Sequence, residues 1–370
     1  MKLYRFIERV LEGVIGFFWK LFILIHEMKN IWTKRALVKA YTPTADEANA
    51  AGMYWRGILG RSIPLWWHRL YASYTGAFDP RYCPEILFST RLEPNASRRC
   101  DRLSLGDKGN LVLFAQAGGF RLPVEYARCR TGNASGGGVF LDDGELFSRL
   151  ENVGECVMKR SRDTSSGRDV FIVNMENGVD LESGKPLSDV LKRMGDDWVC
   201  QERVVQHENV AALYGGSVNT LRIVTYLTNS GVGVCPVTLR LGQGGSKVDN
   251  AHAGGMFVSV DNEGHLGAEA FTEYQERFSH HPDTGIAFEG YRIEGVGKAI
   301  EAAKRSHLVM GSFGFVSWDV CIDESATPVL IEVNLDSQTV WFPQMASGRS
   351  MFGDDTEAVF SDYWSRKVSG

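Results

Sequence analysis

The sequence is most informative in two consecutive segments, Phe315-Val-Ser-Trp-Asp-Val-Cys-Ile-Asp323 and Pro328-Val-Leu-Ile-Glu-Val-Asn334. Both are rich in β-branched and aromatic residues, which indicates β-strands. The polar connection Glu-Ser-Ala-Thr between them suits a hairpin loop. We therefore predict an antiparallel hairpin whose turn is centred between Ser325 and Ala326.

Three oxygen-bearing side chains fall on one face of this predicted hairpin. With that turn, Asp319 lies directly opposite Glu332, and Asn334 shares their face because side chains alternate along a strand. Opposed carboxylates repel each other unless a cation lies between them, and Mg²⁺ accepts carboxylate and amide oxygens together with nucleotide phosphates. Acids that diverge into water on a solvated face are the alternative. We favour the metal because the opposite face is strongly apolar, with Trp318, Val320, Ile331 and Val333.

The composition of the chain excludes several classes of protein. A length of 370 residues, with 44% hydrophobic and 23% charged residues, is typical of a globular protein with a substantial core. The net charge of -5 gives no sign of a nucleic-acid binder. Seven dispersed cysteines without a Cys-x-x-Cys pair argue against a disulfide framework and a zinc site, and they suit a reducing cytosol.

The N-terminal segment is unusually aromatic and apolar. Residues 3–28 are predicted to form an amphipathic helix, and the apolar run from Val14 to Ile25, interrupted by Lys20, is too short to span a membrane. No small-residue cleavage site follows, so we do not expect a signal peptide. Two interpretations stay open: a helix packed on the protein's own body, which is the default, and a helix lying on a membrane surface.

The whole chain, including this N-terminal segment, divides into three regions. Residues 1–100 are predicted to be α-rich, and residues 101–200 change to strand-like alternation from Glu155 onward. Residues 201–370 contain further strand pairs and the hairpin described above. We expect Gly132–Gly138 to be a loop because glycine, serine and asparagine dominate it.

Lys159 ends a predicted strand just before a loop that contains several hydroxyls. Backbone amides and hydroxyls such as that of Ser166, with a fixed cation beside them, can cradle phosphate oxygens. The segment is neither a Walker A motif nor a Rossmann fingerprint. Alone, such a lysine is usually a surface feature. The phosphate-binding interpretation is favoured only because the chain also contains the hairpin with a predicted metal site.

Gln201 and Glu202 end an apolar strand just before a predicted change of direction. A hinge strand between two lobes can offer its backbone to an adenine edge, and Glu202 or Glu208 could accept hydrogen bonds from ribose hydroxyls. These residues are equally consistent with an edge strand whose polar side chains are solvated.

Asn219, Arg222 and Arg240 interrupt strongly apolar strands. Arginine is seldom buried without a partner, and a guanidinium can bind phosphate or carboxylate and stabilise charge that develops during group transfer. A structural ion pair is the alternative. We favour the catalytic role for Arg222 and give the two roles equal weight for Arg240. His252, in a glycine-rich loop, could act as an acid or base, although a lone loop histidine is more often neither.

Several of these segments together resemble one protein family. They are Val218-Asn-Thr-Leu-Arg-Ile-Val-Thr, Gly245-Ser-Lys-Val-Asp-Asn with Gly254-Gly, and Trp318-Asp with Leu330-Ile-Glu-Val-Asn. Over roughly residues 100–350 the chain resembles the sugar-transfer-associated ATP-grasp family. It departs from the family pattern at Ser165-Ser-Gly, where a Gly-Gly is usual, and at Lys159-Arg160, where a Lys-Pro is usual.

The resemblance implies an α+β ATP-grasp fold in which two α+β lobes clamp ATP, behind an α-rich N-terminal region. Residues 101–200 would include the nucleotide-binding lobe, and residues 201–370 the lobe with the Mg²⁺-binding hairpin. The implied roles are phosphate contact for Lys108, Lys159 and Arg222, adenosine contact for Gln201, Glu202 and Val204, and Mg²⁺ ligation for Asp319, Glu332 and Asn334.

The implied reaction is ATP-dependent formation of an amide from a carboxylate and an amine through an acyl phosphate. The expected partners are small-molecule substrates, with a uronic acid of a surface polysaccharide as one option for the carboxylate. Two rivals remain: a kinase that phosphorylates a sugar hydroxyl, and a non-catalytic scaffold of a polysaccharide assembly complex. We expect a cytoplasmic location, with peripheral membrane contact through residues 3–28 as an option.

Overall fold

The computed structural model describes residues 2–161, 170–336 and 338–366. Its first part is helical, as the sequence predicts, and the helices continue past residue 100. The longer ones are α1 (Lys2–Thr33), α2 (Arg35–Ala40), α3 (Ala45–Leu59), α4 (Trp66–Thr75), α7 (Arg99–Leu105) and α8 (Leu111–Gly118). Short helical segments lie between them: α5 (Glu85–Leu87), a π-helical turn (Phe88–Leu92), α6 (Glu93–Ala96) and a 3-10 turn (Lys108–Asn110).

The smaller of the two sheets has the strand order β3-β2-β1-β7-β4-β5-β6. Its elements are β1 (Glu125–Arg130), β2 (Asn133–Gly136), β3 (Val139–Phe140), α9 (Asp143–Leu150), β4 (Gly154–Arg160), β5 (Val170–Glu176), β6 (Val179–Asp180), α10 (Leu187–Met194) and β7 (Trp198–Glu202). Alternate side chains such as Cys156, Met158 and Cys200 join residues of α9 and α10 in one apolar core. The other face of the sheet is therefore left for the rest of the molecule or for a ligand.

The Gly132–Gly138 segment is not a plain loop, which corrects our expectation. Residues Asn133–Gly136 form β2, paired with β1 through Arg128↔Ser135 and its neighbours. Gly136 has no room for a side chain, since a Cβ there would lie 2.9 Å from the carbonyl oxygen of Tyr126. Pairing to a neighbouring strand thus overrides a low local strand preference.

The larger sheet has the order β13-β12-β11-β10-β8-β14-β15, and β9 also pairs with β8. Its strands are β8 (Thr220–Thr228), β9 (Gly231–Val234), β10 (Val237–Leu241), β11 (Met256–Val260), β12 (Leu266–Phe271), β13 (Arg277–Phe278), β14 (Phe315–Ile322) and β15 (Pro328–Asn334). The helices are α11 (Glu208–Leu213), α12 (Val296–Met310), α13 (Trp341–Ser347) and α14 (Thr356–Tyr363). Trp318 and Val320 pack with side chains of α8 and α12, which cover one face of this sheet.

The predicted hairpin is confirmed, and Asp319 is paired with Glu332. The turn itself is offset, because Val320 pairs with Leu330. Ile331 is the extra residue of a β-bulge, and this bulge returns Glu332 to the face of Asp319. Our placement of Ile331 on the opposite, apolar face is therefore wrong: Ile331 lines the cleft described below.

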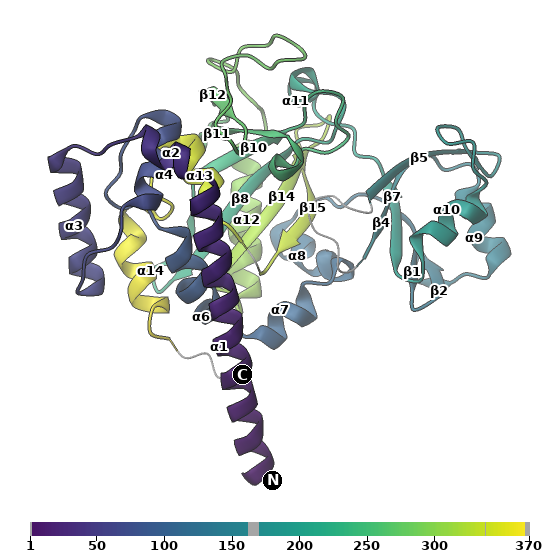
Figure 1. Cartoon of the computed structure of the whole chain (residues 1–370). Coiled ribbons are helices and arrows are strands. Elements are labelled where there is room, and N and C mark those ends of the chain that lie inside the picture. Colours follow the sequence, from purple (N-terminus) through teal and green to yellow (C-terminus); the bar gives the residue numbers. More distant parts are fainter. Residues whose placement is uncertain (1, 162–169, 337, 367–370) are drawn as a thin grey trace.

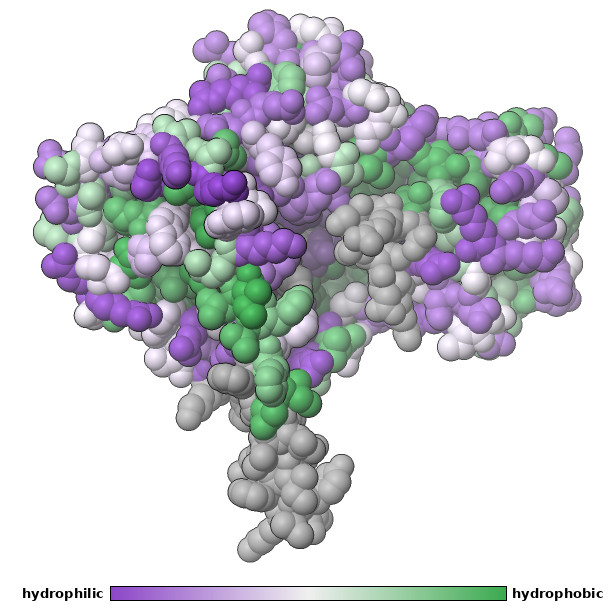
Figure 2. Space-filling view, viewed as in Figure 1, coloured by the Kyte–Doolittle hydropathy of each residue, from purple (hydrophilic) through white to green (hydrophobic). Residues whose placement is uncertain are grey.

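Helix α1 projects from the body of the protein, with its N-terminal part pointing away from both sheets (Figure 1). Apolar side chains are exposed along its described part, among them Phe18, Trp19, Phe22, Ile25 and Trp32. Figure 2 shows green, hydrophobic surface on the projecting helix, broken by paler residues. Ile31 instead joins the core formed by α2, α4 and α13. Among the described residues, no helix is both long and apolar enough to cross a membrane.

Candidate active-site cleft

A cleft of about 620 Å³ lies between the two sheets. Most of the residues singled out in the sequence line it: Lys159, Gln201, Glu202, Val204, Arg222, Arg240, Asp319, Glu332 and Asn334. Segments more than 170 positions apart in the chain thus share one cavity. Such a cavity is large enough for a nucleotide-sized ligand.

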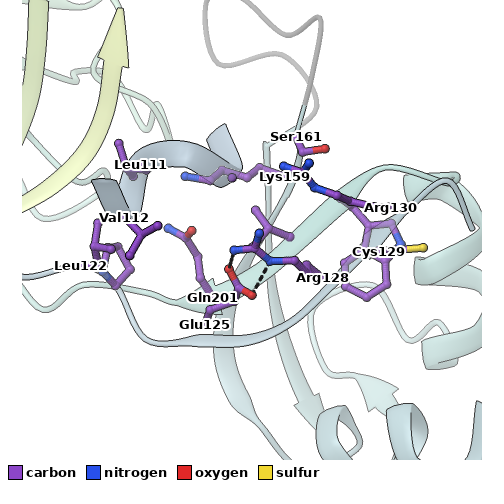
Figure 3. A pocket seen from close by; sticks show the side chains of 14 residues that line it. Leu111, Val112, Leu122, Glu125, Arg128, Cys129, Arg130, Lys159, Ser161 and Gln201 are labelled. Carbon is purple, nitrogen blue, oxygen red and sulfur yellow. Dashed lines mark hydrogen bonds and ion pairs between the residues drawn. The ribbon is translucent and has the colours of Figure 1, made fainter. Parts of the chain in front are cut away.

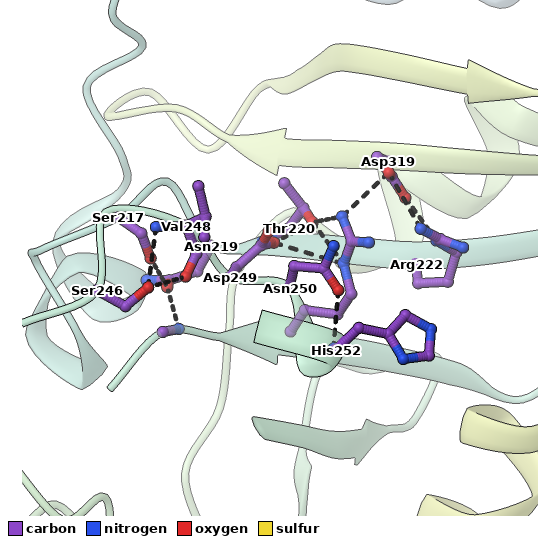
Figure 4. A network of polar contacts seen from close by, with 12 residues as sticks. Ser217, Asn219, Thr220, Arg222, Ser246, Val248, Asp249, Asn250, His252 and Asp319 are labelled. Carbon is purple, nitrogen blue, oxygen red and sulfur yellow. Dashed lines mark hydrogen bonds and ion pairs between the residues drawn. The ribbon is translucent and has the colours of Figure 1, made fainter. Parts of the chain in front are cut away.

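The wall formed by the larger sheet carries a row of charged side chains. Strand register places Glu332 of β15 opposite Asp319 of β14, and Asp319 opposite Arg222 of β8. Arg222 donates from Nε to Oδ1 of Asp319 at 2.6 Å and from Nη2 to Oδ2 at 3.2 Å. Arg240 of β10 reaches the same Oδ2 from Nη2 at 3.0 Å. Two guanidinium groups therefore hold one carboxylate, as Figure 4 shows in part.

The second guanidinium is tied to a further acid. Arg240 Nε lies 3.4 Å from Oδ2 of Asp249, and Arg240 Nη2 donates to Oγ1 of Thr220 at 2.6 Å. The backbone N–H of Thr220 donates to Asp249 at 3.1 Å. Asp249 is thus a site residue that our selection left out, although it lies in the glycine-rich segment that we quoted.

The ionisation of these acids follows from their neighbours. Burial raises the pKa of Asp319, but Arg222 and Arg240 outweigh burial and hold that pKa below its usual range. Burial raises the pKa of Asp249 above its usual range, with only partial compensation by Arg240. We infer that Asp319 stays ionised and keeps both guanidinium groups fixed in the cleft.

The donor set of the hairpin suits Mg²⁺ chemically. Asp319, Glu332 and Asn334 offer oxygens on one face, which are the ligands that Mg²⁺ accepts beside phosphate oxygens. Asp319 already accepts three hydrogen bonds from arginine, and a carboxylate offers about four lone-pair sites, so Glu332 and Asn334 would contribute most. Within the described ranges there is no cluster of three or more His, Cys, Asp or Glu side chains suited to a metal.

The opposite wall of the cleft is the face of the smaller sheet that points away from α9 and α10. Lys159 and Gln201 lie on this face, and they also line a small adjoining cavity of about 70 Å³ (Figure 3). Arg128 and Arg130 of β1 line the same small cavity. Arg128 is paired with Glu125, and Arg130 lies 2.6 Å from Asp107.

The wall formed by the smaller sheet therefore carries three cationic side chains close to the small cavity, those of Lys159, Arg128 and Arg130. The two arginines were missed in the sequence, although their positions in Glu125-Tyr-Ala-Arg-Cys-Arg130 alternate with the buried Ala127 and Cys129. That alternation is the signal that could have found them.

The segment after β7 forms the connection between the two sheets. β7 pairs with β1 and β4 of the smaller sheet, and the bridge Gln206↔Asp323 then joins the chain to the larger sheet. Glu202 is bonded to Arg121 and accepts from the backbone N–H of Val124 at 2.9 Å. Of the two alternatives that the sequence left open, the edge strand is wrong, because β7 lies between β1 and β4 inside the sheet. The Glu202 carboxylate is held by protein groups.

The remaining predicted residues lie elsewhere or outside the described part. Asn219 is buried beside the cleft, where its amide donates to the carbonyl of Tyr214 at 2.7 Å and its oxygen accepts from Ser217. Glu208 starts α11, away from the cleft lining. Ser166 and the side chain of Lys108 fall outside the described residues. The backbone next to Lys108 is close to the site, since Gly109 lines the small cavity together with Lys159.

The segment that follows β15 also reaches the cleft. Gln338, Thr339, Phe342 and Pro343 line it. The Gln338 side chain is fixed on β14, where its Oε1 accepts from Ser317 Oγ and its Nε2 donates to the carbonyl of Phe315, both at 3.0 Å.

Comparison with known proteins places the chain in a family. The model of the sugar-transfer associated ATP-grasp family matches residues 87–359. No curated protein matches the sequence. Among solved structures, similarity is found to an ADP complex of PurK, an N5-carboxyaminoimidazole ribonucleotide synthetase, at 10% identity and a TM-score of 0.38, covering 63% of this chain and 45% of the other.

Two further similar structures are ATP-grasp or amino-acid ligases. The VanG D-Ala:D-Ser ligase from Enterococcus faecalis shows 15% identity and a TM-score of 0.40, covering 69% of this chain and 61% of that chain. The ATP-grasp ligase PsnB, solved with its minimal precursor, Mg and ADP, shows 12% identity and a TM-score of 0.38, covering 70% and 60%. The present chain thus spans less than two thirds of the length of these proteins. Because the family match extends over most of the chain, the protein belongs to the sugar-transfer-associated ATP-grasp family and has the ATP-grasp fold.

Proposed function

We propose that the protein is an ATP-dependent carboxylate–amine ligase that forms an amide through an acyl phosphate. The observation that carries the proposal is the cleft itself. One wall holds Arg222 and Arg240 on a buried Asp319 beside Glu332, and the facing wall presents Lys159. Cations on both walls suit a triphosphate whose terminal phosphoryl group is transferred between them. Membership in the ATP-grasp family supports the same reading.

The residues of the cleft have separable roles in this reaction. Lys159 neutralises phosphate charge from the smaller sheet, and the hinge after Gln201 provides backbone groups for the adenine edge. Mg²⁺, held by Glu332, Asn334 and Asp319, would neutralise charge on the β- and γ-phosphates. Arg222 and Arg240 are fixed before substrate arrives, so they stabilise developing negative charge without reorganising.

The chemical steps need no nucleophile from the protein. A substrate carboxylate attacks the γ-phosphate and releases ADP, and an amine then displaces phosphate from the acyl phosphate. We propose an amino acid or small amine as one substrate and a sugar-derived carboxylate, such as a uronic acid, as the other. The family description, sugar-transfer associated, is what favours a role in surface polysaccharide synthesis.

The test is ADP release with Mg²⁺-ATP across a matrix of uronic acids and amino acids, offered singly and in pairs. Release that requires both a carboxylate and an amine supports the ligase. Release with a sugar alone, and a phosphate retained on that sugar, would establish the kinase instead. Full retention of cellular function by the Asp319→Ala and Glu332→Ala variants would favour the non-catalytic scaffold.

We further propose that α1 lies on a membrane surface. Phe18, Trp19 and Phe22 are more than half exposed on a helix that projects from the body, and such exposed aromatic side chains are costly in water. Flotation with anionic liposomes should retain the full chain and lose a variant that lacks residues 1–28. Equal flotation of both proteins, or of neither, would contradict this assignment.

A further inference from the structure

His252 lies in the cleft and is bonded to a partly buried acid from another strand connection. It occupies the middle of a 3-10 turn, Ala251–Ala253, and its backbone N–H donates to the side chain of Asn250 at 2.9 Å. Its Nδ1 lies 2.7 Å from Oε2 of Glu273, which follows β12. The imidazole also packs on the ring of Phe342, with 5.5 Å between the centroids. The contacts with Glu273 and Phe342 therefore orient the ring, and the backbone hydrogen bond holds the turn that carries it.

Glu273 is held as an anion by a third residue. Lys34, between α1 and α2, donates from Nζ to Oε1 of Glu273 at 2.8 Å. Burial raises the pKa of Glu273, but the hydrogen bonds from His252 and Lys34 outweigh burial and lower it to about 2. An ionised carboxylate can only accept, so Nδ1 of His252 must be the donor in this contact.

The tautomer has a consequence for the other ring nitrogen. When Nδ1 carries the hydrogen of the neutral imidazole, Nε2 keeps a lone pair. The His252 side chain is half exposed and lines the same cleft as Arg222 and Asp319. Lys247 and Asp249 line the same cleft, and its wall carries the Arg222–Asp319–Arg240 cluster. Glu273 and Lys34 are the charged groups bonded in sequence to the imidazole. An oriented histidine with an available lone pair is the usual form of a general base.

We propose that His252 is the general base that deprotonates the amine substrate, with Glu273 and Lys34 as positioning residues. This inference rests on the ligase function proposed above. The substrate ammonium transfers one proton to Nε2 of His252, and the neutral amine attacks the carbonyl carbon of the acyl phosphate. The C–N bond forms, the bond from the carbonyl carbon to the phosphate oxygen breaks, and phosphate leaves with that electron pair. Phosphate takes the second nitrogen proton, and His252 passes its proton to water.

Hydroxylamine separates this step from the rest of the reaction. It is largely unprotonated at neutral pH, so it attacks an acyl phosphate without a base and gives a hydroxamate. The experiment uses the full-length protein, Mg²⁺-ATP and the matrix of uronic acids and amino acids. Each carboxylate is offered once with hydroxylamine and once with each amine. Amide and hydroxamate are quantified for wild type, His252→Ala and His252→Gln.

The expected result is a selective defect. Amide formation falls about 100-fold or more in both variants, because general-base catalysis contributes roughly that much, while hydroxamate formation stays within about threefold of wild type. His265→Ala is the matched control, since His265 is equally exposed and lies 3.0 Å from Asp261 in a comparable pair outside the cleft lining. Glu273→Gln should likewise lower amide formation more than hydroxamate formation.

Other outcomes overturn the inference or its basis. Unchanged amide formation in the His252 variants would exclude a base at this position. An equal fall of amide and hydroxamate would show that His252 acts on binding or on the first step. Absence of hydroxamate with wild type for every carboxylate would overturn the ligase proposal, and the general base with it.

Discussion

Buried carboxylates occur in two regions of this protein, and their pKa values are shifted in opposite directions. In the cleft, Asp319 is 3% exposed and bonded to two arginines. In the N-terminal helices, Glu85 and Glu93 are equally buried, but they accept hydrogen bonds mainly from backbone N–H groups, those of Val340 and Gln338. Burial raises the pKa of Glu93 to about 8, whereas the arginines hold that of Asp319 below its usual range.

The comparison teaches that burial alone does not decide the charge of an acid. The pKa of a buried carboxylate is lowered where two guanidinium groups bond to it directly, and is raised where burial outweighs a backbone hydrogen bond and a more distant cation. In the cleft, two arginines bond to one aspartate, an arrangement that suits a site that binds anions. The helical region instead uses neutral acids to anchor the segment that follows β15.

Asp319→Asn should have the largest effect. It leaves the partly buried Arg222 and Arg240 without the buried anion that they share, and removing one partner of a buried ion pair costs about 3–5 kcal/mol. Urea unfolding should show a loss of this size, and ADP release should be nearly abolished. Asp261→Asn, which removes an exposed acid, is the control and should change stability by less than about 1 kcal/mol. Wild-type stability of Asp319→Asn would contradict the role of the arginine pair.

Lys159→Met tests the facing wall and should separate activity from stability. ADP release should fall about 100-fold, because a cation positioned at the phosphates is lost. The midpoint of thermal unfolding should change far less than in Asp319→Asn. Lys192→Met, on the exposed surface of α10 in the same lobe, is the matched control. An equal loss of activity in both lysine variants would argue against phosphate contact by Lys159.

The two groups of acids should give opposite pH dependence of stability. Glu27, a further buried acid of the helical region, and Glu93 have pKa values raised by burial to about 7 and about 8. Their contribution to stability is full below about pH 4 and is lost as the pH rises through those values. The pKa of Asp319 is lowered, so its contribution is present above about pH 4 and is lost as the pH falls further.

Glu93→Gln isolates the helical part of this behaviour. The variant keeps an acceptor for the N–H of Gln338 but cannot titrate. Between pH 5.5 and pH 8, the free energy of unfolding of wild type should fall, and the fall should be smaller in Glu93→Gln by about 1–3 kcal/mol. Identical slopes in the two proteins would show that Glu93 does not change its protonation on unfolding.

Gln338→Leu should have the smallest effect of the four. The change removes the bonds to Ser317 and the carbonyl of Phe315, which costs about 1–2 kcal/mol, and it alters the cleft lining beside Asn334. The expected readout is a rise in KM for one of the substrates with a smaller change in kcat. Unaltered kinetics would place the substrates away from this part of the cleft.

The sequence made part of the site predictable because local patterns carry it. Alternation of apolar residues correctly predicted the strands that carry Asp319, Arg222 and Lys159. The polar connection correctly predicted the hairpin. The same reasoning failed where strand pairing overrode local preference. Asn133–Gly136 is a strand despite its composition, and the bulge at Ile331, not the turn, brings Glu332 to Asp319.

By itself, the sequence determined the family, the hairpin with its acidic face, and the presence of cations on otherwise apolar strands. Only the tertiary structure decided which charges meet. The Arg222–Asp319 pair depends on the register between β8 and β14, which are 97 positions apart at this contact, and Lys34, His252 and Glu273 come from three separate segments. Local periodicity tells which face a side chain is on, but a contact between distant segments depends on how whole elements pack. The sequence offered His252 as a possible acid or base, but its bonds through Glu273 to Lys34 could be seen only in the tertiary structure.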